Sequence, residues 1–342
     1  MAGAYARQRL KAEMKENVPS SDTRETPSAS GCVSCAVVCP MCALAGVQYR
    51  LNPRQFWNTN REVDLQPTGY RFRGQEGVHP PLLAMWHCSG CYFTAEAGDF
   101  QNPLEGVLIR PETVAFALKE RMRTDVGFRR VVDMLRAGIR LESANFVQAF
   151  KLHLLAFKIW DAIGAMVKQD YLKQAKYSLL LAWLYRDLQT ADPARAQTVA
   201  QLELLHATLQ RDWPDVPKTE TAALQKAVTY YDESLSISTF AKDPMNEIMT
   251  HHRIGRIQMK MGQFEAARDI FRKNTIIAQA IAVQARQQLA YRGSLPGREE
   301  VTGAAREALV DRQRKLESLM TDESRLNDTL RAALAAQAPK PR

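Results

Sequence analysis

Cysteine is confined to one short stretch of this chain. All six cysteines lie between Cys32 and Cys91, and the 251 residues that follow contain none. Structural cysteines scattered by packing alone rarely cluster in this way, so the cluster indicates a shared chemical task. In a reducing compartment, clustered cysteines hold a metal more often than they form disulfides. The fold of this stretch is therefore constrained by the need to bring thiolates together.

Two of the cysteine pairs have the spacing of metal-binding knuckles. They belong to the runs CPMC and CSGC, which are 45 residues apart. A CxxC loop places two thiolates on one side of a tight turn, and two facing loops give the closed tetrahedral shell that structural zinc prefers. The spacer exceeds the roughly 15–20 residues of a minimal ribbon, so it must contain an extra loop or hairpin. The predicted zinc ligands are Cys39, Cys42, Cys88 and Cys91.

A third pair, Cys32-Val-Ser-Cys35, lies directly upstream and leaves alternatives open. The combined run C-x2-C-x3-C-P-x-C is close to a ferredoxin pattern with altered spacing, so an iron–sulfur cluster is one alternative. Cys32 and Cys35 could also replace the CPMC pair as the first knuckle. A redox pair is the third alternative, and it would need a stabilised thiolate, typically at a helix N-terminus.

The predicted zinc site has a structural role. Zinc with four cysteine ligands has no open coordination position, so it cannot activate water or polarise a carbonyl. A segment of about 60 residues buries little core, and we expect the metal to be its main source of stability. His87 precedes the second knuckle, but strand neighbours point to opposite faces. We therefore expect His87 to pack or form hydrogen bonds rather than bind the metal.

The periodicity of the sequence predicts an α+β fold. Short apolar runs punctuated by Pro, Gly and Asn indicate strands up to about residue 100, and helical periodicity begins near residue 111. The expected parts are a disordered lead-in at 1–30, a zinc ribbon at 31–100, connecting helices at 101–140, a tetratricopeptide-like helical domain at 141–292, and a C-terminal amphipathic helix with a short tail at 293–342. The longer helices are expected at roughly 143–168, 171–189, 194–211, 219–238, 244–261, 263–290 and 299–337.

One stretch of the helical region has tetratricopeptide-like spacing. In HHRIGRIQMKMGQFEAARDIFRKN, Gly255 and Ala267 are small residues where the two helices of a repeat approach closely, and Gly262 lies at the turn between them. Phe271 is expected to fill space between repeats. An earlier helix pair fits the same scheme if residues 190–218 are an insertion. We therefore expect stacked helix pairs with a concave face made mainly by the first helix of each pair.

The predicted concave face includes a basic stripe. Its three basic residues are spaced i, i+4 and i+8, so they share one helix face, and two methionines border them. This arrangement predicts a groove for an acidic, partly apolar peptide, with a solvated basic face as the alternative. The predicted groove residues are Met249, His252, Arg256, Met259 and Lys260.

The last predicted helix carries leucines near a heptad spacing, which indicates a packing seam. Such a seam usually docks on its own domain, and self-association with a second chain is the alternative. The seam residues are Leu309, Leu316, Leu319, Leu326 and Leu330.

The positive charge of the chain belongs to its helical part. The chain carries 46 Lys+Arg and 37 Asp+Glu, and residues 1–100 contain only 10 and 9 of these, respectively. A ribbon that gripped phosphates would itself be basic, because counterion release needs cations at the contact surface. Nucleic-acid binding through the ribbon is therefore disfavoured, and a basic helical body remains the alternative route to nucleic acid.

Several classes of protein are not supported by the sequence. The longest apolar stretch, 146–167, is interrupted by charged residues, and a membrane span needs roughly 20 apolar residues. The N-terminus lacks the apolar stretch of a secretory signal, so we expect a cytoplasmic protein. The phosphate-loop, dinucleotide, zinc-protease and nucleophile-elbow motifs are missing. Thiol chemistry at Cys32 and Cys35 is the remaining enzymatic alternative.

The two knuckles and the sequence between them resemble the uncharacterised bacterial domain-of-unknown-function family 2225. In that family a CPxCG knuckle is followed by an Asp-rich segment, a Tyr, a turn, an aromatic strand and a CPxCGY knuckle. The similar features here are Cys39 to Cys42, Val63-Asp64-Leu65, Tyr70, the turn Gly77 to Pro81, the strand Leu82 to His87, and Cys88 to Cys91 with Tyr92. The segment Ala175 to Leu188 also resembles the family's helical part, so the likeness covers most of residues 39–240.

This chain departs from the family pattern after each knuckle. The glycine that follows each knuckle in the family pattern is replaced by Ala43 after the first knuckle and is missing before Tyr92 after the second. A left-handed turn at these positions would therefore be strained or remodelled. The resemblance implies a zinc-ribbon head with a tetratricopeptide-like body, and it implies no reaction.

Together these features predict a non-enzymatic cytosolic adaptor or scaffold. A structural zinc ribbon would accompany a helical groove that binds a protein partner, such as an acidic peptide segment. The alternatives are a nucleic-acid-binding regulator that uses the basic helical body and a thiol redox protein that uses Cys32 and Cys35.

Overall fold

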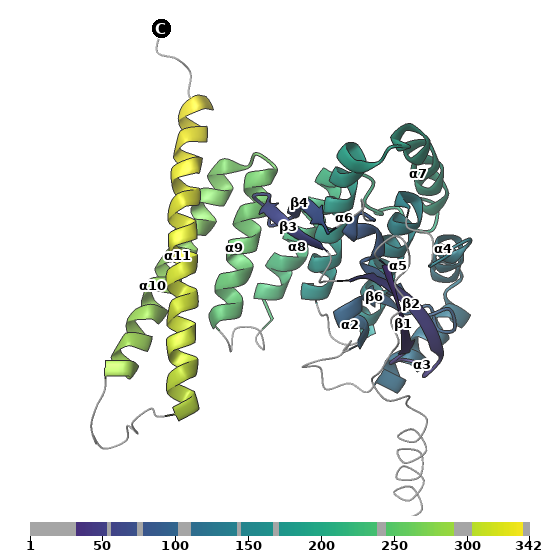
Figure 1. Cartoon of the computed structure of the whole chain (residues 1–342), viewed down its shortest axis with the longest axis horizontal. Helices are drawn as coiled ribbons and strands as arrows, with labels where there is room; N and C mark the ends of the chain where they lie inside the picture. The colour runs from purple at the N-terminus through teal and green to yellow at the C-terminus, as the bar shows by residue number, and fades with distance from the viewer. Residues whose placement is uncertain are drawn as a thin grey trace, which may run out of the picture. The chain divides into compact units, whose positions relative to one another are not determined.

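The computed structural model describes residues 32–52, 56–73, 78–101, 111–141, 145–166, 171–237, 244–290 and 303–337 (Figure 1). The expected lead-in at 1–30 and the last residues of the expected tail lie outside this set, as does most of the linker before the last helix. Within the described residues, no helix is both long enough and apolar enough to cross a membrane.

The described strands form three two-stranded sheets. In the first sheet the two strands are antiparallel, and Cys32 pairs with Leu51 at one end and Val38 with Ala45 at the other. Of the expected strand Leu82 to His87, only Met85–His87 is a strand, because Pro80–Leu83 form a 3-10 helix. The strand that contains Cys32 and Cys35 was not expected. The sheets are β1 (Cys32–Val38) with β2 (Ala45–Leu51), β3 (Phe56–Arg61) with β4 (Pro67–Phe72), and β5 (Met85–His87) with β6 (Thr94–Glu96). A short 3-10 helix, η1 (Pro80–Leu83), precedes β5.

Helices make up most of the rest of the described chain, and the bounds of the longer helices lie within a few residues of the predicted ones. Helix boundaries follow capping and turn signals, as at α4, where the Asp125 side chain accepts from the backbone N–H of Phe128. The α+β class is therefore confirmed. The helices are α2 (Ala97–Gln101), α3 (Pro111–Thr124), α4 (Val126–Arg136), α5 (Phe146–Met166), α6 (Tyr171–Ala191), α7 (Arg195–Leu209), α8 (Glu220–Leu235), α9 (Pro244–Lys260), α10 (Phe264–Ala290) and α11 (Gly303–Gln337).

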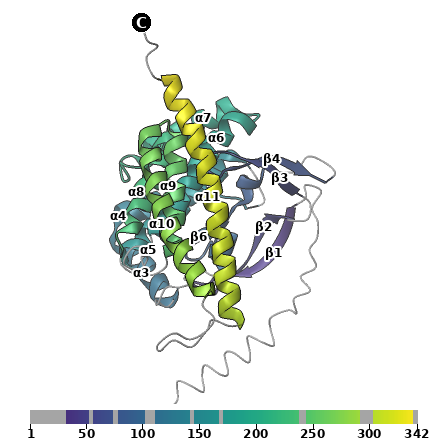
Figure 2. The same ribbon diagram turned by 90° about the vertical axis from the view of Figure 1, so that its left-hand side faces the viewer.

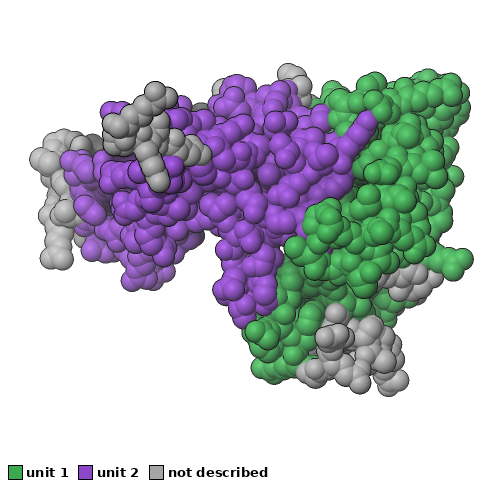
Figure 3. Space-filling model, turned by 90° about the horizontal axis from the view of Figure 1, so that it is seen from above, with its two compact units in different colours: residues 1–57, 70–166, 188–216 green, residues 58–69, 167–187, 217–342 purple. Residues whose placement is uncertain are grey.

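The chain forms two compact units (Figure 3). Unit 1 comprises residues 1–57, 70–166 and 188–216, and unit 2 comprises 58–69, 167–187 and 217–342. This division differs from the expected boundary near residue 100, because the helices from α3 to α5, together with α7, group with the ribbon. The expected insertion at 190–218 lies almost entirely in unit 1.

Unit 1 has an aromatic core that joins the ribbon to α5. Phe93 follows the second knuckle, and its ring centroid lies 5.4 Å from that of Phe100 and 5.9 Å from that of Trp160 on α5. Trp86 contacts Phe100 at 5.9 Å, and all four rings are buried. The ribbon is therefore held to α5 by apolar packing in addition to whatever stability the expected metal supplies. Its large aromatic residues share a core with a helix that the ribbon alone could not supply.

In unit 2, α11 packs along α9 and α10 (Figures 1 and 2). Leu316 and Leu319 are buried with Ile248 and Ala278, and Leu330 is buried with Phe271. The predicted leucine seam is thus occupied by the protein's own helices. Self-association through these three leucines would require α11 to leave this core.

The turn between α9 and α10 has the expected geometry. Gly262 has a φ of +75° there, a conformation that glycine adopts without strain. Gly255 faces the Phe271 ring so closely that an added Cβ would lie 2.6 Å from ring carbon Cε1. The small residue at this position is therefore required by the approach of the two helices.

Gly255→Ala is expected to destabilise the protein despite the better helix propensity of alanine. Overpacking costs about 1–3 kcal/mol, which exceeds the gain of about 1 kcal/mol from replacing a helical glycine. The matched control is Gly98→Ala in α2, where an added Cβ meets nothing within 4 Å. Chemical unfolding of both variants provides the measurement, and a Gly255→Ala protein as stable as the wild type would contradict the packing argument.

Candidate functional site

The two CxxC loops of unit 1 have the same backbone conformation. The Cys39 N–H donates to the Leu44 carbonyl at 2.9 Å, and the Ala43 N–H donates to the Cys39 carbonyl at 2.9 Å. The second loop repeats both hydrogen bonds: the Cys88 N–H donates to the Phe93 carbonyl at 2.9 Å, and the Tyr92 N–H donates to the Cys88 carbonyl at 2.8 Å. Each loop therefore presents its two thiols from a turn that is closed by backbone hydrogen bonds.

These loops bring the four predicted ligand sulfurs together. The Sγ atoms of Cys39 and Cys91 lie 3.5 Å apart, as do those of Cys42 and Cys88, and all four lie within 4.8 Å of one another. A tetrahedral metal with bonds of about 2.3 Å to sulfur needs sulfurs about 3.8 Å apart. The four free cysteines therefore have the arrangement of a closed metal-binding shell.

The electrostatics of the cluster also favour a cation. Hydrogen bonding to Cys39 and Cys91 holds the pKa of the Cys88 thiol well below its usual range. Hydrogen bonding to Cys88 raises the pKa of Cys39 to about 12, and hydrogen bonding to the other two raises the pKa of Cys91 strongly as well. Neighbouring thiols thus favour ionisation of Cys88 and oppose ionisation of Cys39 and Cys91. A bound divalent cation would allow all four to ionise.

The residue after each knuckle has a left-handed backbone. Ala43 has a φ of +59° and Tyr92 a φ of +63°, at the two positions where glycine is missing from the sequence pattern. The loops therefore keep the left-handed turn and accept the strain, rather than being remodelled. A non-glycine residue in this conformation costs about 1–2 kcal/mol.

His87 supports the second knuckle without facing the sulfurs as a ligand. The Thr94 hydroxyl donates to the Tyr92 carbonyl at 2.9 Å, so it accepts from Nδ1 of His87 at 2.8 Å. Burial lowers the pKa of His87 to about 4, which keeps the ring neutral. The Gln48 side chain accepts a hydrogen bond from the backbone N–H of His87 at 3.1 Å and donates one to the His87 carbonyl at 2.7 Å. His87 therefore forms hydrogen bonds, as expected, and is absent from the group of possible ligands.

Cys32 and Cys35 lie in strand β1 and do not form a knuckle. Residues i and i+3 of a strand point to opposite faces, and their Cα atoms are about 10 Å apart, beyond the reach of a disulfide. The alternatives in which this pair replaces the first knuckle or acts as a CxxC redox pair are therefore corrected. The sequence pattern hid this because CVSCAVV is both a CxxC run and a strand rich in β-branched residues.

The predicted basic stripe of unit 2 is covered by the chain itself, so the expectation of an open groove along it is corrected. Arg256 is only 9% exposed and donates to the Val63 carbonyl at 2.7 Å and to the Asp322 carboxylate of α11. Lys260 contacts Glu62 at 3.2 Å. Met259 is buried with Phe271. Sequence periodicity showed that these residues share a face, but not that α11 covers it.

His252 occupies the centre of the same buried network. Its Nε2 accepts from Nε of Arg256 at 2.8 Å, so its Nδ1 donates to the buried Glu323 of α11 at 3.3 Å. Glu323 also accepts from Thr275 at 3.0 Å and from Asn274. The acidic pair Asp322-Glu323 within the leucine seam was the sequence signal that could have placed α11 over the stripe.

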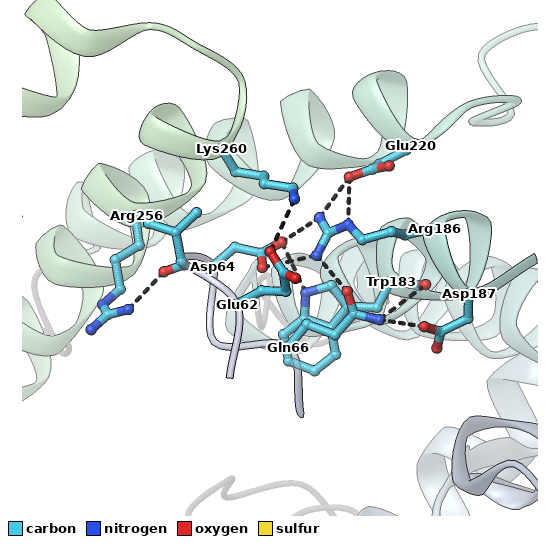
Figure 4. A network of polar contacts seen from close by, with 10 residues as sticks. Glu62, Asp64, Gln66, Trp183, Arg186, Asp187, Glu220, Arg256 and Lys260 are labelled. Carbon is cyan, nitrogen blue, oxygen red and sulfur yellow. Dashed lines mark hydrogen bonds and ion pairs between the residues drawn. The ribbon is translucent and has the colours of Figure 1, made fainter. Parts of the chain in front are cut away.

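The Asp-rich segment of the family pattern is held by an arginine fork (Figure 4). Asp64 is 1% exposed, and its two carboxylate oxygens accept from Nη1 and Nη2 of Arg186 at 3.1 and 2.8 Å. Trp183 donates to the same carboxylate at 3.1 Å, and Arg186 also binds Glu220 of α8 at 2.6 Å. Arg256 and Lys260 hold the same segment from α9. The function of this segment is therefore to connect α6, α8 and α9.

Two of the predicted groove residues do line an open hollow. Met249 and His252 contribute to a cavity of about 950 Å³ in unit 2, which is formed by α9, α11 and the chain around Leu65. Arg256, Met259 and Lys260 do not line it. The structure thus places the accessible groove along α11, on the N-terminal half of α9, rather than along the whole stripe.

Removing one knuckle cysteine is expected to abolish metal binding. Cys91→Ser should lose most of the bound metal, because it removes one of the four thiolates of the tetrahedral shell. Cys35→Ser is the matched control and should retain the metal content of the wild type. Elemental analysis of the purified full-length proteins measures both. Equal loss in the two variants would contradict the assignment of the ligands.

Ala43→Gly is expected to stabilise the protein by about 1 kcal/mol, because glycine removes the left-handed strain. Tyr92→Gly relieves the same strain but should destabilise, since the Tyr92 ring lies 4.3 Å below the Arg136 guanidinium and stacks on His87. Thermal unfolding of the metal-loaded proteins separates the two effects. A loss of stability in Ala43→Gly would show that the turn is not strained.

Arg186→Lys is expected to cost about 2 kcal/mol of stability, because an ammonium cannot make the paired hydrogen bonds to Asp64 and Glu220. Arg331→Lys, at a residue whose side chain is 79% exposed beside Asp328, should change stability by less than about 0.5 kcal/mol. Urea unfolding of both variants tests this. Equal effects would mean that the arginine fork is not needed.

Comparison with known proteins identifies the family of the chain. Residues 34–291 match the family described as "Uncharacterized protein conserved in bacteria (DUF2225)", which is more than half of the chain and includes both knuckles, the Asp64 segment and the helices through α10. No curated protein and no solved structure matched the chain. The chain therefore belongs to the bacterial family DUF2225.

Proposed function

We propose that this protein is a non-enzymatic adaptor whose ribbon is fixed by a structural zinc ion and whose helical unit binds a protein partner. The observation that carries the proposal is the four-thiol shell, closed by two hydrogen-bonded turns with all sulfurs within 4.8 Å of one another. A site of this kind leaves no coordination position for substrate, so its metal would stabilise structure rather than perform chemistry.

Zinc is the metal that fits this donor set best. Four thiolates in tetrahedral array are typical of structural zinc sites, and the turns hold the sulfurs at distances that suit one ion. The second knuckle is tied to Gln48, Thr94 and Arg136, so its ligands are oriented before the metal binds. Because the thiols must remain reduced, a reducing compartment such as the cytosol suits this site.

Elemental analysis with an absorption spectrum tests the metal assignment. We expect about one zinc per chain and no visible absorption band. Iron with a broad visible band would instead identify an iron–sulfur cluster and would reject the structural zinc.

The adaptor role is supported by the helical unit. Helices α8, α9, α10 and α11 form a layered array with an open cavity of about 950 Å³, and tetratricopeptide-like arrays bind partners through such hollows. In the described residues, the four cysteines are the single cluster of potential metal ligands. The chemistry available elsewhere is that of ion pairs and packing, which suits binding.

Affinity purification of the full-length protein from its own host, before and after nuclease treatment, tests the adaptor role. We expect a protein partner in near-stoichiometric amount that persists after the nuclease. Recovery of nucleic acid alone would favour a regulator that uses the basic helical body. Recovery of neither would reject the adaptor role.

A further inference from the structure

The hollow of unit 2 has an apolar floor. It is lined by Met245 and Met249 of α9 and by Leu309 and Leu319 of α11, and the two methionines pack against the buried cluster that contains Leu319. Methionine side chains are flexible and polarisable, so they adapt to apolar side chains of different shapes. Such a floor favours a ligand that inserts aliphatic or aromatic side chains.

The hollow is elongated along α11. Its lining residues on that helix extend from Ala308 to Arg325, and from Asp311 onward they recur at steps of one and three residues, which keeps them on one side of the helix. At 1.5 Å per residue this face is about 25 Å long. A ligand that fills it must itself be extended, which suits a helical or extended peptide segment better than a compact small molecule.

The rim of the hollow is predominantly basic. Four cationic residues line it, against the two acidic residues Asp311 and Asp322. The Asp311–Lys315 pair is 2.7 Å long but both side chains are more than 60% exposed, so this pair contributes little and can exchange partners. Asp322 is already engaged by Arg256 and by Arg325 at 3.3 Å. The cationic residues are Arg61, Arg312, Lys315 and Arg325.

We propose that this hollow docks an acidic amphipathic segment of a partner protein. Its apolar side chains enter the floor of methionine and leucine, and its Asp and Glu side chains face the basic rim. This inference rests on the proposed adaptor function and identifies the docking site and the chemistry of the partner. Nucleic acid fits less well, because among the described residues no Phe, Tyr or Trp lines the hollow to stack on bases, and its floor is aliphatic.

The test uses the full-length, metal-loaded protein and two labelled synthetic peptides of about 18 residues, a length that matches the hollow. Both peptides carry leucine at positions i, i+3, i+4 and i+7, and their remaining positions are glutamate-rich in one and lysine-rich in the other. Fluorescence anisotropy in about 0.15 M salt keeps weak long-range charge effects screened. We expect the glutamate peptide to bind at least about tenfold more tightly.

Two adjacent charge reversals on α11 provide the matched controls. Lys315→Glu places a negative charge on the rim and should weaken binding of the glutamate peptide about fivefold or more. Arg314 lies outside the lining, so Arg314→Glu should leave the affinity for this peptide unchanged. Circular dichroism confirms that both variants fold. Equal effects of the two reversals, equal binding of both peptides, or no binding of either would overturn the proposal.

Two further results would assign the hollow to another occupant and overturn the proposal. One is an oligonucleotide that binds more tightly than the glutamate peptide and is weakened by Lys315→Glu. The other is a dimer in sedimentation that Lys315→Glu abolishes. If a host partner is retained equally by the wild type and by Lys315→Glu, the adaptor function stands and this docking site is rejected. If the wild type retains no partner, the adaptor function itself fails.

Discussion

Four thiolates can occupy one small volume only when a cation neutralises them, and the structure of unit 1 follows from that constraint. Two identical turns, each closed by two backbone hydrogen bonds, present the sulfurs at 3.5 Å within each facing pair. The left-handed residues Ala43 and Tyr92 show that the chain accepts backbone strain to keep this geometry. Phe93, which follows the second knuckle, is buried against Trp160 of α5, so the cysteine cluster adjoins the first helical core.

Unit 2 uses charge rather than metal to hold a loop in place. Arg186, Arg256 and Lys260 converge on the segment from Glu62 to Gln66, and α11 adds Asp322 and Glu323 to the same network. Breaking one partner of a buried ion pair leaves an uncompensated charge, so such a network fixes one arrangement of its elements strongly. The positive charge that the sequence assigns to the helical region is therefore used partly inside the protein. Among the cations left outside this network, Arg61, Arg312, Lys315 and Arg325 line the hollow beside α11.

Local patterns in the sequence predicted the elements and the metal ligands well. The CxxC spacing identified the four cysteines that meet, and helical periodicity located α5 to α11 within a few residues, because both signals are encoded by near neighbours. Prediction was weaker for contacts between distant segments. Two features depend on partners far away in the sequence: α11 covers Arg256, and Phe93 shares a core with Trp160. The third, the strand that contains Cys32 and Cys35, was missed because the same short run also fits a CxxC motif.

The central claim is that Cys39, Cys42, Cys88 and Cys91 form a closed shell around one zinc ion. X-ray absorption at the zinc edge of the full-length protein tests it most directly, because the first coordination shell reports ligand type, number and distance. The account predicts four sulfur ligands at about 2.3 Å and no nitrogen or oxygen ligand. A shell that contains nitrogen or oxygen, such as bound water, would contradict it, since the site would then be open.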